Sequence, residues 1–232
     1  MFWLSRKVQC LKGKTLTGTL YYGFVKSFLL DLAAVIMQRK DDLNRLDAEC
    51  GDGDFGVGMY VAFQHVQQAV VRSTGRDIGA LLKDVGRAIL SSAGGASGPL
   101  FGTLFIEAGR AVEGRTEIDL ASLESMFRGT LRGICQRGGA NVGDKTLVDS
   151  LEPATVSFGE SARAGIDLQS ALGKAAEAAK LGSESTKRLI AKHGKARYLG
   201  EQTLGHEDPG AYVIALLFQM LADRYRSQSI PS

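Results

Sequence analysis

Hydrophobic residues recur with helical spacing through most of this chain. Between 166 and 189 the apolar positions form a stripe with a period of about 3.6 residues, and Tyr212, Ala215, Leu216 and Met220 repeat the pattern near the end. The chain holds only four prolines, so long stretches lack a helix breaker, and its 29 glycines cluster between the stripes. The pattern predicts helices over 18–40, 56–74, 76–93, 98–114, 119–137, 144–163, 167–193 and 208–227.

Capping chemistry supports these helices. Aspartates, which accept the free N–H groups of a first helical turn, precede four of them: Asp119, Asp144, Asp167 and Asp208. Pro209 would occupy a first helical position, where its missing N–H costs nothing, and we expect Pro153 to kink the helix that contains it. No segment alternates apolar and polar residues as a strand does, and no repeat or linker divides the chain. The sequence predicts an all-α fold, a single bundle of about eight helices.

Composition excludes several classes of protein. The chain is 44% hydrophobic and 23% charged, which argues against a disordered or fibrous protein. Its cysteines, Cys10, Cys50 and Cys135, are odd in number and contain no CxxC pair, so neither a disulfide framework nor a zinc ribbon is expected. Such cysteine usage favours a reducing compartment, and we predict the cytoplasm. The apolar runs are too short to span a bilayer, so no membrane association is expected.

Positive charge concentrates at the start of the chain. Residues 1–40 carry seven Lys/Arg and one acid, a net charge of +6, whereas the remainder sums to −3. A basic start is typical of a nucleic-acid arm, of an organelle transit peptide or of a loose terminal extension. The segment 8–11 is too short for the apolar core of a secretory signal. We adopt the loose extension and predict no nucleic-acid partner, while a transit peptide stays open.

The densest chemical signal is an acidic, glycine-rich motif. Asp47, Asp52 and Asp54 lie within eight residues, and two carboxylates ~4 Å apart repel by roughly 4 kcal/mol at an effective dielectric near 20. Converging carboxylates therefore need a cation, and oxygen ligands suit Mg²⁺ or Ca²⁺ rather than zinc. EF-hand spacing is absent, and Mg²⁺ held by few carboxylates usually shares its coordination with phosphates. The alternative is a solvated acidic turn.

The same segment formally matches GxGxxG from Gly51 to Gly56. A dinucleotide site is rejected because no hydrophobic strand precedes the motif and its carboxylates would face a pyrophosphate. A second small-residue motif covers 91–102. It would let backbone N–H groups at a helix start approach phosphate oxygens, or would only allow close helix packing.

A third motif, Arg137 to Thr146, resembles a P-loop, but Asp144 separates Gly143 from Lys145 and no strand precedes it. We interpret it as the start of a helix that Asp144 caps. Thr146 would then face a site, and Leu147 would form part of the wall of a nucleobase pocket. The alternative is a capped surface loop.

The fourth motif is a long irregular stretch over 194–211, of a kind that is usually functional in a compact domain. Arg197 within it suits bidentate phosphate contact. We interpret His206 as a structural hydrogen-bond partner, place His65 and His193 on helices facing solvent, and expect no nucleophilic role for Cys50. All four motifs fall at helix ends, as a nucleotide site at one end of a bundle requires.

Taken together, these motifs resemble a known family. They read Leu46-Asp47…Gly51-Asp52-Gly53-Asp54, Gly94 to Gly102, Gly143-Asp144-Lys145-Thr146, and Tyr198-Leu199-Gly200-Glu201…Gly205 to Ala211. The sequence is similar to the L subunit of dihydroxyacetone kinase, the nucleotide-binding half of that enzyme, from about residue 17 to 226. The resemblance implies one domain over 17–232 after an extension over 1–16. It also implies an antiparallel eight-helix barrel with the nucleotide site at one end.

The resemblance also assigns the site. It implies ADP or ATP bound through two Mg²⁺ ions, with the metal ligands falling on Asp47, Asp52 and Asp54. The family usually carries His where this chain has Phe55, which puts substrate choice or the efficiency of phosphoryl transfer in question. The implied nucleotide contacts are Phe55, Gly56, Val57, Gly58, Ala96, Ser97, Gly138, Leu147, Arg197, Asp208, Pro209 and Gly210.

The resemblance implies a kinase subunit of glycerol metabolism that is active only with a partner. A separate K subunit would hold dihydroxyacetone or a related ketose such as erythrulose, and an M subunit could supply the phosphoryl group. Arg197 would stabilise charge, with no general base on this chain; a homodimer is also compatible. One alternative is a regulatory module whose structural ADP signals to a transcription regulator without turnover. Another is a Ca²⁺-binding helical bundle.

Overall fold

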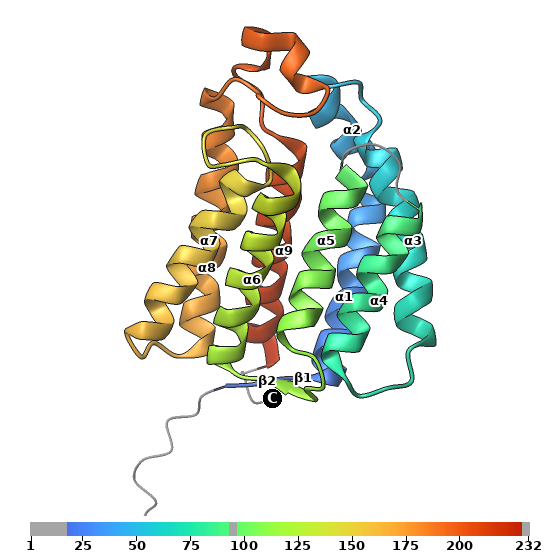
Figure 1. Ribbon diagram of the computed structural model, residues 1–232, viewed down its shortest axis with the longest axis vertical. Coiled ribbons are helices and arrows are strands. Elements are labelled where there is room, and N and C mark those ends of the chain that lie inside the picture. The colour runs from blue at the N-terminus through green and yellow to red at the C-terminus, as the bar shows by residue number, and fades with distance from the viewer. Residues whose placement is uncertain (1–17, 93–96, 229–232) are drawn as a thin grey trace, which may run out of the picture.

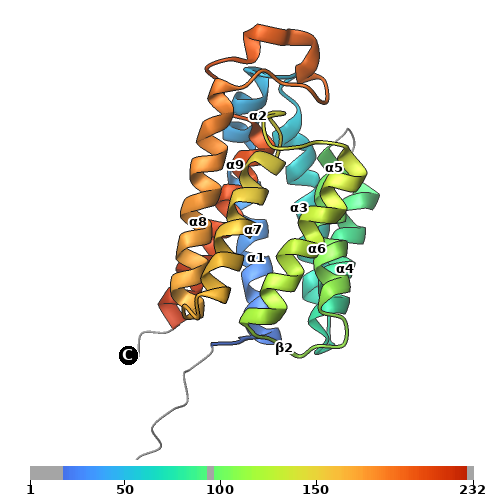
Figure 2. The ribbon, with the colours of Figure 1, turned by 60° about the vertical axis from the view of Figure 1, so that its left-hand side comes forward.

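The computed structural model describes residues 18–92 and 97–228, and it confirms the all-α prediction. Eight long helices of the described part run alternately up and down around a common interior (Figures 1 and 2). They are α1 (Tyr22–Gln38), α3 (Phe55–Arg72), α4 (Ile78–Ser92), α5 (Ser97–Ala111), α6 (Leu120–Gly138), α7 (Val148–Arg163), α8 (Leu168–Ser185) and α9 (Pro209–Gln228). The expected extension over 1–16 lies outside the described residues.

The barrel closes because each helix buries one stripe against its neighbours. In α4 the buried residues Ile78, Leu81, Leu82, Val85 and Ile89 follow the spacing of one helix face. Consecutive long helices pack side by side, and α9 contacts α1 as well as α8. The ends of the chain are thereby joined into one hydrophobic core.

The two ends of the barrel are built differently (Figure 1). At the lower end the short strands β1 (Leu20–Tyr21) and β2 (Glu117–Ile118) pair antiparallel. At the upper end lie α2 (Lys40–Ala48), the 3-10 helices η1 (Thr186–Arg188) and η2 (Ala196–Thr203), and the loop between α6 and α7. The upper end thus carries the irregular segments that the sequence singled out.

Several predicted helix boundaries were wrong. The helix expected over 18–40 ends at Gln38, and after Arg39 the chain turns into α2. The helix expected over 167–193 ends at Ser185, so His193 lies in a loop rather than on a helix. The helix expected from 144 begins at Val148 and runs through Pro153 without interruption. Tertiary contacts at the upper end decide these boundaries, as the site below shows.

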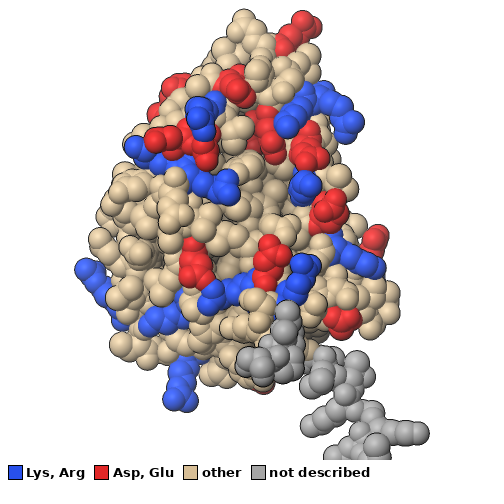
Figure 3. All heavy atoms as spheres, turned by 180° about the vertical axis from the view of Figure 1, so that it is seen from behind, with Lys and Arg blue, Asp and Glu red and all other residues tan. Residues whose placement is uncertain are grey.

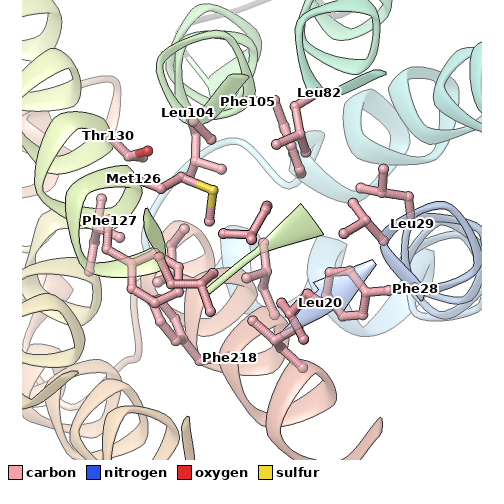
Figure 4. A pocket seen from close by; sticks show the side chains of 18 of the residues that line it. Leu20, Phe28, Leu29, Leu82, Leu104, Phe105, Met126, Phe127, Thr130 and Phe218 are labelled. Atoms are coloured by element: carbon pink, nitrogen blue, oxygen red, sulfur yellow. The ribbon is translucent and has the colours of Figure 1, made fainter. Parts of the chain in front are cut away.

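The interior contains an apolar cavity of about 80 Å³ (Figure 4). Leu104 and Phe105 of α5, Met126 of α6 and Phe218 of α9 are among its lining, and Leu20 of β1 contributes from the strand end. Because the lining is almost wholly apolar, the cavity offers water few hydrogen-bond partners.

On the rear face, charged side chains gather toward the two ends of the molecule with an uncharged band between them (Figure 3). Acidic and basic side chains are interspersed there, in keeping with a net charge of only +3. No helix of the described part is long and apolar enough to cross a bilayer.

Candidate functional site

An open pocket of about 670 Å³ lies at the upper end of the barrel. All four sequence motifs contribute to it, although they are distant along the chain. This convergence is what the sequence predicted for a site at one end of a bundle. The lining comes from Asp47, Cys50 to Asp52, Asp54, Phe55, Gly58 and Met59; from Gly98 to Phe101; from Arg137, Gly138 and Lys145 to Leu147; and from His193 to Tyr198 and Asp208 to Gly210.

The acidic cluster is formed by a helix end and the turn that follows it. Asp47 lies in the last turn of α2, and its Oδ2 accepts hydrogen bonds from the backbone N–H groups of Asp54 and Phe55, each at 3.0 Å. These bonds fold the turn back on α2, so that Asp52 and Asp54 approach Asp47. One carboxylate oxygen from each of the three lies within 4.8 Å of the others. An all-oxygen donor set of this kind fits Mg²⁺ or Ca²⁺.

The electrostatics of the cluster match a cation site. Burial raises the pKa of Asp47, and the carboxylates of Asp52 and Asp54 add to the rise, while the N–H bonds from the turn oppose it. The Lys195 ammonium forms an ion pair with Asp52 and lies 3.5 Å from Asp54. Its hydrogen bond is the main cause of the lowered pKa of Asp52. One cationic side chain therefore already balances part of this negative charge.

Lys195 is a site residue that the sequence analysis missed. Its signal was its place beside Arg197 in the fourth motif, but nothing local shows that it faces aspartates more than 140 residues away. Arg197 also lines the pocket. Its guanidinium carbon lies 4.6 Å from the ring centroid of Tyr198, and its Nη2 donates to the Tyr198 hydroxyl at 2.5 Å. Lys195 and Arg197 thus bring an ammonium and a guanidinium to the pocket, which Arg137 and Lys145 also line.

Leu147 and the start of α9 form another part of the pocket wall. Asp208 accepts the N–H of Ala211 at 2.7 Å, and α9 begins at Pro209, so both predicted roles are confirmed. A Cβ on Gly210 would lie 3.4 Å from the Leu147 Cβ, which shows how closely the two segments approach. Asp208 is partly buried on the pocket wall. Loss of water around its carboxylate raises its pKa to about 7, while the Ala211 N–H and the charge of Lys145 oppose the rise.

The cap predicted for α7 was wrong. Asp149, inside the first turn, accepts the N–H groups of Gly143 at 2.6 Å and Thr146 at 2.7 Å, and so holds the loop before the helix. Asp144 instead accepts from the Asn141 N–H at 2.8 Å. Sequence spacing favoured Asp144 because it stands before the apolar run, whereas the tight loop moved the helix start to Val148.

Asp144 joins this loop to the segment beyond η1. Its carboxylate pairs with Lys192 Nζ at 2.8 Å and with His193 Nε2 at 3.3 Å. Lys192 is the main cause of the pKa of Asp144 falling to about 2. His193 was expected to face solvent from a helix; it is a partly exposed partner of Asp144 instead.

The turn at the start of α3 gives a mixed result for the expected nucleotide contacts. Phe55 and Gly58 line the pocket, whereas Gly56 and Val57 are not among its lining residues. Gly56 packs so closely on α2 that a Cβ would lie 2.0 Å from the Lys40 carbonyl oxygen. The Val57 N–H donates to Asn44 Oδ1 at 3.1 Å. Asn44 is therefore a second residue of α2, missed from the sequence, that holds the start of α3.

Phe55 is buried, and its ring meets Phe101 edge-on at 6.3 Å between centroids. Its backbone N–H is already bonded to Asp47. The Phe55 side chain thus extends the hydrophobic core up to the edge of the pocket.

The described part of the small-residue motif is divided between the pocket and helix packing. Gly98 lines the pocket, whereas Gly102 lies against α4, where a Cβ would be 2.5 Å from Leu90 Cγ. Ala96 lies outside the described residues, and Ser97 is the first residue of α5. Of the other expected contacts, Gly138 and Leu147 both line the pocket.

The remaining candidate residues are structural, as predicted. His206 Nδ1 lies 3.1 Å from Glu49 Oε2. His65 is exposed on α3, with its Nδ1 3.0 Å from the Val61 carbonyl oxygen. Burial raises the pKa of the Cys50 thiol to about 11, which leaves no thiolate for nucleophilic attack at neutral pH.

Comparison with known proteins agrees with this geometry. The DAK2 domain model matches residues 49–223. A protein of Escherichia coli K12, described as "PEP-dependent dihydroxyacetone kinase, ADP-binding subunit DhaL", is 38% identical over 198 residues, which cover 85% of this chain and 94% of that protein. An L-erythrulose 1-kinase of Mycolicibacterium smegmatis is 34% identical over 82% of this chain but only 33% of its own length.

A solved structure shares the fold. The dihydroxyacetone kinase of C. freundii in complex with AMP-PNP and Mg²⁺ superposes with a TM-score of 0.68 and 26% identity, over 94% of this chain and 38% of that one. This chain therefore spans little more than a third of that larger kinase. The domain match, the identity to full-length L subunits and the shared barrel lead to one conclusion: the chain belongs to the DAK2 domain family, as an L subunit of the dihydroxyacetone kinase type.

Proposed function

We propose that this chain is the ADP- or ATP-binding subunit of a dihydroxyacetone-type kinase. In this proposal it transfers a phosphoryl group to dihydroxyacetone or a related ketose on a separate K subunit. The observation that carries the proposal is the open pocket in which the carboxylates of Asp47, Asp52 and Asp54, glycine-lined turns and the cations of Lys195 and Arg197 meet. The description of the E. coli relative as an ADP-binding subunit supports it.

Asp47, Asp52 and Asp54 are the proposed metal ligands, and a pair of Mg²⁺ ions, together with Lys195 and Arg197, would offset the charge of three carboxylates and a polyphosphate. When bound, Mg²⁺ neutralises phosphate charge. Asp47 is the most constrained ligand, because two backbone N–H groups fix one of its oxygens. Lys195 is free to exchange its carboxylate partners for phosphate oxygens, since its ammonium is held only at the pocket surface.

The other pocket residues position the nucleotide. Leu147, Pro209 and Gly210 provide an apolar wall suited to a nucleobase. Gly58 and Gly138 allow backbone to approach a ligand without a side chain between them. Arg197 keeps its proposed role as a charge stabiliser, and Lys195 joins it at the carboxylate end. Catalysis would then rest on positioning and charge neutralisation rather than on proton transfer by this chain.

The partners are part of the proposal. The K subunit would present the ketose at the open mouth of the pocket, and an M subunit is the proposed phosphoryl source for a retained ADP. The description of two bacterial relatives, from Escherichia coli and Listeria innocua, as PEP-dependent supports this arrangement. A homodimer and a cytoplasmic location also remain proposals; both cysteines of the described part, Cys50 and Cys135, are free.

A regulatory module with structural ADP is the second candidate. Phe55 is the observation that favours it. An apolar ring packed on Phe101 stands where the family usually has an imidazole, so a polar contact near the phosphates is lost.

Nucleotide retention tests the site itself. Native mass spectrometry of the purified protein should show bound ADP or ATP with Mg²⁺, and Asp52→Ala should abolish it. Asp41→Ala, an exposed acid on the neighbouring α2, is the matched control and should retain the nucleotide. An Asp52→Ala protein that still carries stoichiometric ADP and Mg²⁺ would refute the site.

Turnover separates the two candidates. The protein is mixed with a cognate K subunit and dihydroxyacetone, and ketose phosphate is measured by mass spectrometry. Product formation that requires both chains supports the kinase. Bound nucleotide without any turnover supports the regulatory module.

A further inference from the structure

Lys145 is a buried cation that the proposed chemistry does not use. Only 3% of its surface is exposed, and it lies where three segments meet, two of which, the loop before α7 and the entry to α9, line the pocket. We propose that Lys145 is a positioning residue whose ammonium holds these segments together and so keeps the nucleotide wall in place. The inference rests on the proposed nucleotide-binding function and adds a residue to it.

The backbone at Lys145 is unusual. Its φ is +58°, and it is the one non-glycine residue of the described part with positive φ. Left-handed backbone is disfavoured for residues with a Cβ and persists where the surroundings impose it. Asp149 imposes it here by accepting the N–H groups of Gly143 and Thr146 on either side.

This conformation aims the side chain at two distant carbonyl groups. Lys145 Nζ donates to the Thr186 carbonyl at 2.7 Å and to the His206 carbonyl. Thr186 follows directly after α8, and His206 lies in the turn before α9. One ammonium therefore links the loop before α7, the end of α8 and the entry to α9.

Negatively charged side chains surround the Lys145 ammonium. Asp149, Asp208, Glu207 and the Cys50 thiol face Lys145, and each of them acts to raise its pKa against the lowering effect of burial. Asp208 also depends on this junction through its backbone, because its N–H donates to Thr186 Oγ1 at 3.0 Å. Removal of the ammonium would take an opposing positive charge away from the buried Asp149 and from Asp208.

The consequence for the pocket follows from its wall. Leu147 stands two residues after Lys145, and Gly210 stands two residues after Asp208. Their close approach defines the wall, with 3.4 Å between the Leu147 Cβ and a Cβ placed on Gly210. When the ammonium is lost, the part-buried His206 carbonyl loses this donor, and the buried Thr186 carbonyl is left with the N–H of Leu189. The turn at 206–208 then loses its link through Lys145 to the loop before α7. The wall then opens, and a bound nucleotide dissociates faster.

The test compares MgADP affinity, by isothermal titration calorimetry on the full chain, in Lys145→Gly and Lys145→Met. Glycine removes the ammonium and also the backbone strain, whereas methionine removes the charge and keeps the bulk. Lys187→Met is the matched control, because Lys187 belongs to the same region and pairs at the surface with Glu207. Propylammonium chloride at millimolar concentration is then added to each variant, with sodium chloride as the salt control.

We expect the MgADP dissociation constant to rise at least tenfold in both Lys145 variants and to stay within twofold in Lys187→Met. Propylammonium should lower the MgADP dissociation constant of Lys145→Gly at least threefold, because the glycine leaves space for it. It should leave the dissociation constant of Lys145→Met unchanged. Unchanged affinity in Lys145→Gly would overturn the proposal. So would a loss of folding or of affinity that the amine does not reverse, because the lysine would then serve only the fold. A wild-type chain that fails to bind MgADP would instead refute the proposed function.

Discussion

The ion pairs of Asp144 make a prediction about stability that the structure allows to be quantified. Asp144 is 8% exposed and its carboxylate is shared between the Asn141 N–H, Lys192 and His193. Asp144→Asn keeps the size of the side chain and an oxygen acceptor but removes the charge. The variant therefore isolates the electrostatic part of the link between the α7 loop and the segment after η1.

The magnitude follows from the pKa of Asp144, which falls from 3.8 to about 2 on folding. At about 1.4 kcal/mol per pKa unit this corresponds to roughly 2 kcal/mol of stability at pH 7. Lys192 is 61% exposed, and solvent screening reduces the value to about 1–2 kcal/mol. Because the folded pKa is depressed, the contribution is complete above the unfolded pKa and is lost as the pH falls from about 4 toward about 2.

Urea unfolding of both proteins, followed by circular dichroism at several pH values, measures the difference. We expect Asp144→Asn to be less stable by about 1–2 kcal/mol from pH 7 to pH 5, with the gap closing below pH 4. Asp84→Asn, which removes an exposed pair with Arg87, is the control and should stay within about 0.5 kcal/mol throughout. A gap that is the same at pH 7 and pH 3 would show that shape, not charge, is responsible.

Two further predictions concern packing. Gly182→Ala places a Cβ 2.2 Å from the Asp149 carbonyl oxygen of α7, so thermal unfolding should show a loss of roughly 2 kcal/mol; Gly173→Ala on the same helix meets nothing within 4 Å and should gain roughly 0.5–1 kcal/mol. If both variants lost stability equally, close packing of α8 on α7 would not be the cause. Ala108→Val adds two methyl groups at the wall of the apolar cavity of about 80 Å³, and urea unfolding should show a gain of about 0.5–1 kcal/mol. A loss would mean that the cavity cannot accept the added groups without strain.

Local chemistry determined much of this protein from sequence alone. Apolar spacing fixes the helices because each must bury one stripe. Asp119 and Asp167 cap α6 and α8 as predicted, since their side chains accept the N–H groups of Ser122 and Ser170 three residues on. The motif around Asp47, Asp52 and Asp54 was also recognisable, because the backbone bonds that gather it span only eight residues.

The tertiary structure alone decided what depends on contacts between distant segments. Lys195 faces Asp52 across 143 positions, and Lys145 reaches His206 across 61. The true start of α7 was missed for the same reason, because Asp149 accepts a hydrogen bond from the loop before the helix. The end of α8 was missed because Asp144 pairs with Lys192, which lies in the segment that was expected to be helical. Periodicity records which face of a helix is buried. It carries no information on which charges meet once the barrel closes, and the upper end with its pocket is built from those contacts.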